Sequence, residues 1–189
     1  MSRIDVLLQH PKRTLGVLAL VLVAVGVAVG SGANFSAQSA NPSNTFTAGT
    51  LTMSNSNNAA AILTASNWKP GDTSTGTVDI KNTGSLPGTF SLSRTALTDS
   101  DNTNPLSQKI DLIVHDCGLF TGTTPPSCST GGTDVYTGTL AGLTSAQNLG
   151  TYAAGDQHRY KFTATFNTSA GNVYQGGSST ATFTWNAVQ

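Results

Sequence analysis

The chain of 189 residues contains no glutamate and few charges of any kind. Charged residues make up 10% of the sequence, against about 25% in ordinary soluble domains, and the formal net charge is zero. Because a nucleic-acid-binding protein needs a basic face, this balance argues against nucleic acid as a partner. The lack of glutamate also excludes zinc peptidases of the His-Glu-x-x-His type, in which glutamate is the general base.

The residues that favour helices are scarce, whereas those that favour strands and turns are abundant. The sequence has 29 threonines and 20 glycines. Such a composition favours β-structure over helix. Disorder is excluded, because 38% of the residues are hydrophobic and no net charge drives the chain apart.

Residues 1–33 have the three parts of a secretory signal peptide. A positive region at residues 3–13 precedes an apolar run at residues 15–29, and small residues follow up to Ala33. A helix that crosses a bilayer needs about 20 apolar residues, so this run is short for a permanent anchor. We expect cleavage between Ala33 and Asn34 and a secreted product; retention as an N-terminal anchor is the alternative.

The remainder of the chain predicts short antiparallel strands separated by turns. Apolar and polar residues alternate at 158–166 and 180–187, as they do in a sheet with one buried and one wet face. Further strands are expected at 77–81, 89–93 and 110–115, and weaker ones at 46–53, 60–65 and 134–140. The fold class predicted for residues 45–189 is all-β, a two-sheet antiparallel sandwich that is jelly-roll-like. Residues 34–44 form a polar N-terminal arm ahead of it.

The two cysteines flank a stretch rich in glycine, threonine and proline. In an oxidising compartment, Cys117 and Cys128 are expected to form a disulfide that closes this loop. Metal ligation is the rival interpretation, but a second cysteine pair or a nearby histidine doublet is lacking.

Motifs of common catalytic sites are missing. The sequence has no Gly-x-Ser-x-Gly elbow, no phosphate-binding glycine loop and no dinucleotide fingerprint. Outside the signal peptide the histidines are His115 and His158, both expected at exposed strand positions. We therefore predict no catalytic, cofactor-binding or metal-binding residues and no enzymatic activity.

Two further features admit a binding interpretation beside a structural one. Residues 99–104 (DSDNTN) resemble the start of a calcium loop but lack its glycine and its final glutamate, so a weak calcium site and a polar loop both stay open. Trp68 precedes a Pro-Gly turn and is expected at the edge of the core. With Tyr136 and Tyr152, it is also a candidate contact for sugar.

Several segments together resemble the TasA/camelysin (CalY) family of secreted bacterial matrix proteins. They are GANFS at residues 32–36, SNTFTAGTLTM at 43–53, ASNWKPGDTSTGTVDIKNTGS at 65–85 and NVYQGGSS at 172–179. They follow one another in family order, whereas residues 98–152 depart from the family pattern.

The resemblance implies a jelly-roll subunit that a SipW-type signal peptidase releases and that assembles into fibres of a biofilm matrix. It implies self-association by strand donation, in which the arm with Phe35 as its apolar anchor completes the sheet of the next subunit. Other matrix or minor fibre proteins and polysaccharide are possible partners. The alternatives are a carbohydrate-binding or adhesive sandwich and a camelysin-type metallopeptidase.

Overall fold

The computed structural model describes residues 11–30, 45, 47–129 and 131–189. The chain divides into two units, residues 1–46 and 47–189. In the first unit, helix α2 (Pro11–Gly30) contains the apolar run. No helix in the described part of the chain is long and apolar enough to cross a membrane. The predicted cleavage site at Ala33 and Asn34, and the predicted anchor Phe35, lie outside the described residues.

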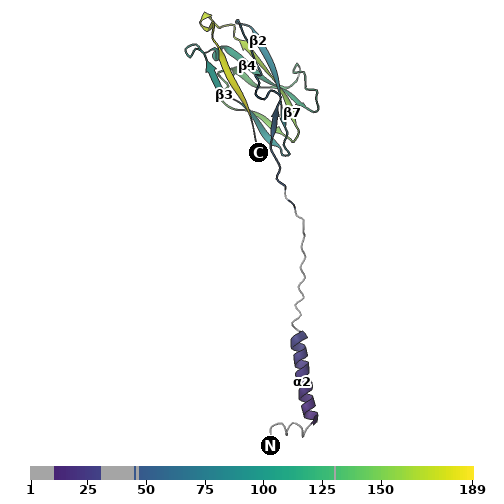
Figure 1. Ribbon diagram of the computed structural model, residues 1–189. Coiled ribbons are helices and arrows are strands. Elements are labelled where there is room, and N and C mark those ends of the chain that lie inside the picture. The colour runs from purple at the N-terminus through teal and green to yellow at the C-terminus, as the bar shows by residue number, and fades with distance from the viewer. Residues whose placement is uncertain (1–10, 31–44, 46, 130) are drawn as a thin grey trace. The chain divides into compact units, whose positions relative to one another are not determined.

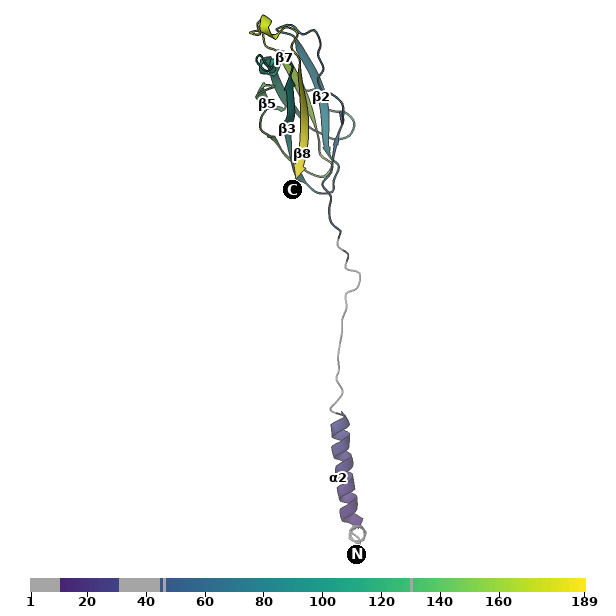
Figure 2. The same cartoon turned by 60° about the vertical axis from the view of Figure 1, so that its left-hand side comes forward.

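The second unit consists of two antiparallel sheets packed face to face (Figures 1 and 2). The five-stranded sheet has the order β1-β2-β7-β4-β5, and the three-stranded sheet has the order β6-β3-β8. The strands are β1 (Met53–Asn55), β2 (Thr73–Asn82), β3 (Gly88–Asp99), β4 (Ile110–Phe120), β5 (Thr133–Thr139), β6 (Gln147–Tyr152), β7 (Gln157–Phe166) and β8 (Ser179–Val188).

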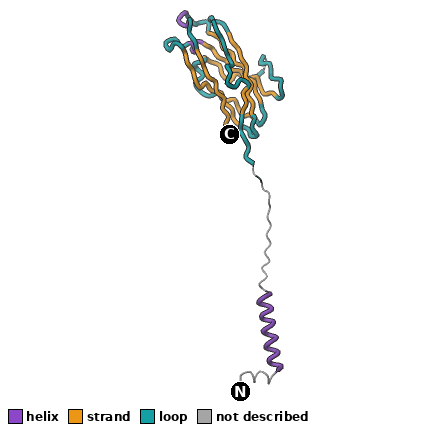
Figure 3. The backbone as a smooth tube through the Cα atoms, in the orientation of Figure 1, coloured by secondary structure: helices purple, strands orange, loops and turns teal. Residues whose placement is uncertain are grey.

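The connections confirm the predicted all-β sandwich with jelly-roll character. The chain crosses from one sheet to the other between β2 and β3, between β3 and β4, and at every connection from β5 onward. Repeated crossing of this kind is typical of a jelly roll. Apart from two short 3-10 turns, Leu106–Lys109 and Asn172–Tyr174, the connections are loops (Figure 3).

The core lies between the sheets and consists of the alternating apolar residues that the sequence indicates. Every second residue of β7 from Tyr160 to Phe166 is buried, and the same holds for β4 from Ile110 to Val114. Burial of one such side chain stabilises the fold by roughly 1.5–3 kcal/mol. The largest fully buried apolar side chains are Tyr152, Tyr160, Phe90, Phe162, Ile80, Leu92, Leu112 and Leu143.

Two of the weak strands are predicted wrongly: the one expected at 46–53 differs in its extent, and the one expected at 60–65 is not a strand. Among the described residues of the first range only Met53 is in a strand, and residues 60–65 contain none. The second segment instead crosses the face of β2, where the Ile62 carbonyl lies so close to Gly76 that a Cβ there would be 1.8 Å from its oxygen. The strand predicted at 134–140 is confirmed as β5.

Opposite ends of the sandwich carry different features. At the end where β8 finishes, the chain enters the unit: the Thr50 carbonyl accepts hydrogen bonds from the Ser85 and Leu86 amides in the β2–β3 turn, at 2.9 and 3.1 Å. Val188 lies at the same end, because it pairs with Thr89. The start of β8, at Ser179, lies at the other end.

Candidate functional site

Strand β8 borders the three-stranded sheet with one edge unpaired among the described residues. It pairs with β3 along its whole length, from Ser179 opposite Asp99 to Val188 opposite Thr89, and no described strand lies beyond it. An edge strand of ten residues exposes a row of backbone N–H and C=O groups that another strand can pair with.

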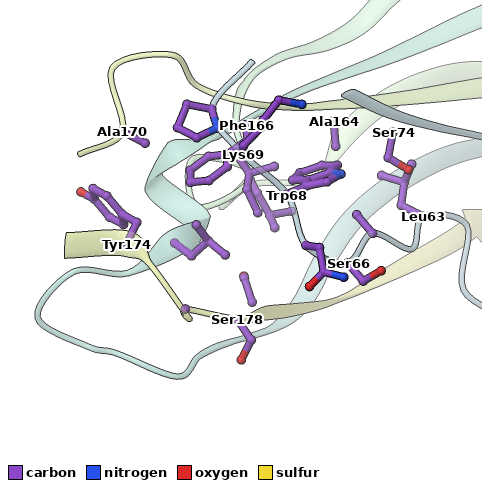
Figure 4. Close-up of a pocket in the computed structure, with 18 of the residues that line it drawn as sticks. Leu63, Ser66, Trp68, Lys69, Ser74, Ala164, Phe166, Ala170, Tyr174 and Ser178 are labelled. Atoms are coloured by element: carbon purple, nitrogen blue, oxygen red, sulfur yellow. The ribbon is translucent and has the colours of Figure 1, made fainter. Parts of the chain in front are cut away.

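A groove of about 660 Å³ opens between the two sheets beside the first half of this edge (Figure 4). From β8 it is lined by Ser179, Ala181 and Phe183, and residues 63–70 form its opposite wall. Residues 170–172 and 174–178 line its outer end. The groove therefore lies at the end of the sandwich opposite to the point where the chain enters.

Apolar side chains form the floor of the groove. The Trp68 and Phe166 rings stack with their centroids 6.5 Å apart, and Phe183 packs against Phe162 at 4.9 Å. The prediction that Trp68 lies at the edge of the core is confirmed, since it is half-buried and packs against the core cluster. Its exposed part is presented to the groove (Figure 4).

One polar atom on the β8 wall has no hydrogen-bond partner in the described structure. The Ser179 hydroxyl is buried, yet neither donates nor accepts a hydrogen bond there. Buried hydroxyl groups are normally paired, because an unpaired one costs about 1–3 kcal/mol. The groove thus combines an unpaired strand edge, apolar surface and an unsatisfied hydroxyl, which is a combination that favours an extended peptide.

The other two aromatic residues considered for sugar binding do not form a surface with Trp68. The expectation for Tyr152 is wrong, since only 1% of the residue is exposed and its ring stacks between Phe90 and His158. Its hydroxyl bonds to that of Tyr160, and burial raises the pKa of both phenols. Tyr136 is half-buried, and its hydroxyl donates to the Thr139 carbonyl at 2.6 Å.

Neither histidine is the freely exposed side chain that the sequence suggested. His115 Nδ1 lies 2.6 Å from Asp134 Oδ1, and His158 Nδ1 lies 2.9 Å from Asp116 Oδ2. The hydrogen bond that the His115 ring donates to Asp134 is the main cause that raises the pKa of His115. Each ring therefore has its own carboxylate partner on the sheet, and the raised pKa of His115 indicates an ion pair with Asp134. Pairing across strands could not be read from the alternation alone.

The carboxylates of the calcium-like loop are also engaged separately. Asp99 accepts hydrogen bonds from the Ser107 amide and hydroxyl, at 2.9 and 2.6 Å. Asp101 accepts from the Thr103 amide at 2.7 Å, which is the main cause that lowers its pKa. In the part of the chain that the structure describes, no three histidine, cysteine or acidic side chains are placed to hold a metal ion.

The comparison with known families matches the resemblance in the sequence. The profile of the family described as camelysin metallo-endopeptidase matches residues 10–112, which is more than half of the chain. The chain belongs to this family. A search of curated proteins found none that matches it.

The family description names a metallopeptidase, and the described residues do not fit a catalytic metal. Such a site needs typically three protein ligands, an open position and a base. His115 and His158 are bound to different aspartates, and no third ligand joins either of them. Nor do the residues of the groove supply ligands, since it is lined by apolar, hydroxyl and amide side chains and Lys69.

The family match ends at Leu112, before the disulfide loop. Cys117 and Cys128 are bonded as predicted, with their Cα atoms 4.7 Å apart. The disulfide joins β4 to the loop that leads into β5, at the end of the sandwich away from the groove. The loop therefore belongs to the part of the chain that departs from the family pattern, and it takes no part in the groove.

Proposed function

We propose that this chain is the secreted structural subunit of an extracellular fibre, in which the groove beside β8 binds the arm (residues 34–44) of a neighbouring copy. The observation that carries the proposal is the coincidence of the groove with the unpaired edge of β8. Membership of the camelysin family supports it, through the resemblance to matrix proteins described above.

The dimensions of the arm suit this edge. The groove borders the first five residues of β8, which extend about 17 Å, and the eleven residues of the arm reach at most about 36–40 Å, enough to fill it and still connect to the next subunit. The arm is polar apart from Phe35 and small alanines, so it gains little by folding onto its own domain. Pairing with an open edge supplies partners for its backbone groups, and the groove receives its one large apolar side chain.

The position of the groove suits a fibre. The chain enters the sandwich at one end, and the groove opens at the other. An arm that leaves one copy and fills the groove of the next makes a head-to-tail contact. In such a contact the two copies contribute different surfaces. Contacts of this kind repeat into open filaments unless a rotation closes them into a ring.

The proposal assigns the subunit no catalytic role and places it outside the cell after cleavage between Ala33 and Asn34. Its partner is a further copy of itself; other matrix or minor fibre proteins and polysaccharide remain additional proposals. A carbohydrate-binding function has less support, because Tyr152 is buried and Tyr136 uses its hydroxyl internally.

The experiment is to fill the groove without disturbing the fold. Ala181 lines the groove, whereas its neighbour Thr182 is exposed on the opposite face of β8. We expect Ala181→Trp to give a folded monomer, shown by circular dichroism, that forms no fibres in electron microscopy. The matched control, Thr182→Trp, should polymerise like the parent. A folded Ala181→Trp variant that forms normal fibres would contradict the proposal.

A further inference from the structure

We infer that the donated strand runs antiparallel to β8, with Phe35 opposite Phe183, Ala37 opposite Ala181 and Ser39 opposite Ser179. This inference rests on the proposed function and adds a polarity and a register to it. Both follow from the direction of β8, the extent of the groove and the unpaired hydroxyl that it contains.

The polarity follows from where the groove opens. β8 starts at Ser179, at the outer end of the groove, and runs inward past Phe183. An arm from another copy is tethered outside by its C-terminal end, so its N-terminus must point inward and the strand runs antiparallel to β8. A subunit's own arm would run the other way, because its tether at residue 47 lies at the end where β8 finishes. Every described strand pair of this fold is antiparallel.

The register follows from matching two alternating patterns. The β8 residues that face the groove are Ser179, Ala181 and Phe183. In the arm, Phe35, Ala37 and Ser39 occupy alternate positions with the same residue types in reverse order. Directly opposite residues of an antiparallel pair share a face, so this alignment puts both sets into the groove.

Shifted alignments are worse for identifiable reasons. A shift by one residue turns Gln38 into the apolar groove, since every side chain then changes face. A shift by two residues toward the core places Phe35 opposite Trp185, which does not line the groove. A shift by two residues the other way puts Ala37 opposite Ser179 and leaves its hydroxyl unpaired.

The unpaired hydroxyl supplies an independent reason for this register. The buried Ser179 Oγ has no partner in the described structure. With Ser39 directly opposite, the two hydroxyls lie on one face, and cross-strand serine and threonine pairs form hydrogen bonds. Pro42 then lies beyond the start of β8, where its lack of a backbone N–H does not interrupt the pairing.

The test is a cysteine pair at opposite, outward-facing positions. Ser36→Cys and Thr182→Cys are directly opposite in this alignment, and Thr182 is exposed. The described chain has no free thiol, so the two new ones react with each other under mild oxidation. We expect a ladder of covalent multimers on a non-reducing gel of assembled protein. The control pair, Ser36→Cys with Asn186→Cys, is four residues out of register and should give no ladder.

The outcomes separate the register from the proposed function. Suppose that the protein forms fibres but only the control pair gives a ladder, and Ser36→Cys with Thr182→Cys gives none. That result would overturn the register and leave strand donation intact. A bond within one chain would overturn the polarity. If the unmodified mature protein forms no fibres, the proposed function itself fails.

Removing the serine hydroxyls gives a second readout that does not need cross-linking. We expect Ser179→Ala to raise the concentration needed for polymerisation about threefold to tenfold, which is the effect of one lost hydrogen bond. It should not destabilise the monomer, in which the hydroxyl is unpaired. Adding Ser39→Ala should change little further. Additive effects of the two changes would contradict their pairing.

Discussion

At the residue scale, one buried side-chain amide joins two parts of the sandwich. Asn82 is fully buried at the end of β2. Its Nδ2 donates to the carbonyls of Leu86 and Tyr152, at 2.8 and 3.2 Å, and its Oδ1 accepts from the Gly84 amide at 2.9 Å. The side chain thereby joins the β2–β3 turn to the end of β6. Its burial could not be predicted, since Asn in a sequence such as Asn-Thr-Gly-Ser usually indicates an exposed turn.

We predict that Asn82→Ala lowers the free energy of unfolding by roughly 3 kcal/mol, because it leaves buried backbone groups without partners. Urea denaturation followed by circular dichroism measures this. The control is Asn186→Ala, at an exposed position on β8, for which a change within about 0.5 kcal/mol is expected. Equal effects of the two substitutions would show that the Asn82 bonds do not stabilise the fold.

A second residue, His115, has hydrogen-bond acceptors at both ring nitrogens. Nδ1 lies 2.6 Å from Asp134 Oδ1, and Nε2 lies 2.9 Å from the Gly131 carbonyl. A carboxylate and a carbonyl can only accept, so both contacts are hydrogen bonds only when the ring is an imidazolium. The charges around it are Asp134, Asp116 and, opposite on β7, Lys161.

The raised pKa of His115 predicts a stability that depends on pH. The imidazolium is stabilised in the folded state, so its contribution is full below the ordinary pKa near 6.5 and disappears as the pH rises through the higher folded value. We expect a loss of about 1 kcal/mol, reduced by solvent because Asp134 is half-exposed. Thermal unfolding at a series of pH values measures it. In Asp134→Asn this loss should be smaller; an unchanged profile would contradict the assignment.

At the element scale, the sequence predicted the strands in which apolar and polar residues alternate. It did not predict β6, in which they do not. β7 and β8 alternate without interruption, so their bounds were predicted within two residues. β6 was not predicted, because only Leu149 and Tyr152 are buried and Gly150, with a φ of 91°, interrupts the alternation. The groove could not be predicted either, since it depends on which strands become neighbours.

The disulfide is a further element that the sequence predicted. Replacing both Cys117 and Cys128 with serine should lower the free energy of unfolding by roughly 3 kcal/mol, the loop-entropy value for so short a loop. Polymerisation should persist below the lowered melting temperature, because the loop lies away from the groove. Thermal melts combined with light scattering measure both effects, and loss of polymer from a still-folded variant would contradict this separation.

At the scale of the whole molecule, the family description and the described side chains lead to different expectations of activity. We predict that recombinant mature protein does not hydrolyse casein, because the two histidines that could hold a hydrolytic metal are bound to two different aspartates. Chelator-sensitive cleavage that disappears in a His115→Ala, His158→Ala double variant would show that the prediction is wrong.

The proposed subunit is a sandwich with a groove at one end and a strand that it donates from the other. Its two parts can be removed one at a time. A protein without residues 34–44 keeps the groove but has no strand, whereas the Ala181→Trp variant keeps the strand but has a filled groove. Because the strands described here begin at Met53, deletion of the arm should leave the core intact.

Light scattering with size-exclusion chromatography on these two proteins, alone and mixed, tests the central claim most directly. Circular dichroism should show that each is folded. Each alone is predicted to remain a monomer, while the mixture should form a one-to-one dimer and no larger species, since one groove and one arm remain. Fibres from the protein without residues 34–44, or a mixture that stays monomeric although the unmodified protein polymerises, would contradict assembly through this arm and groove.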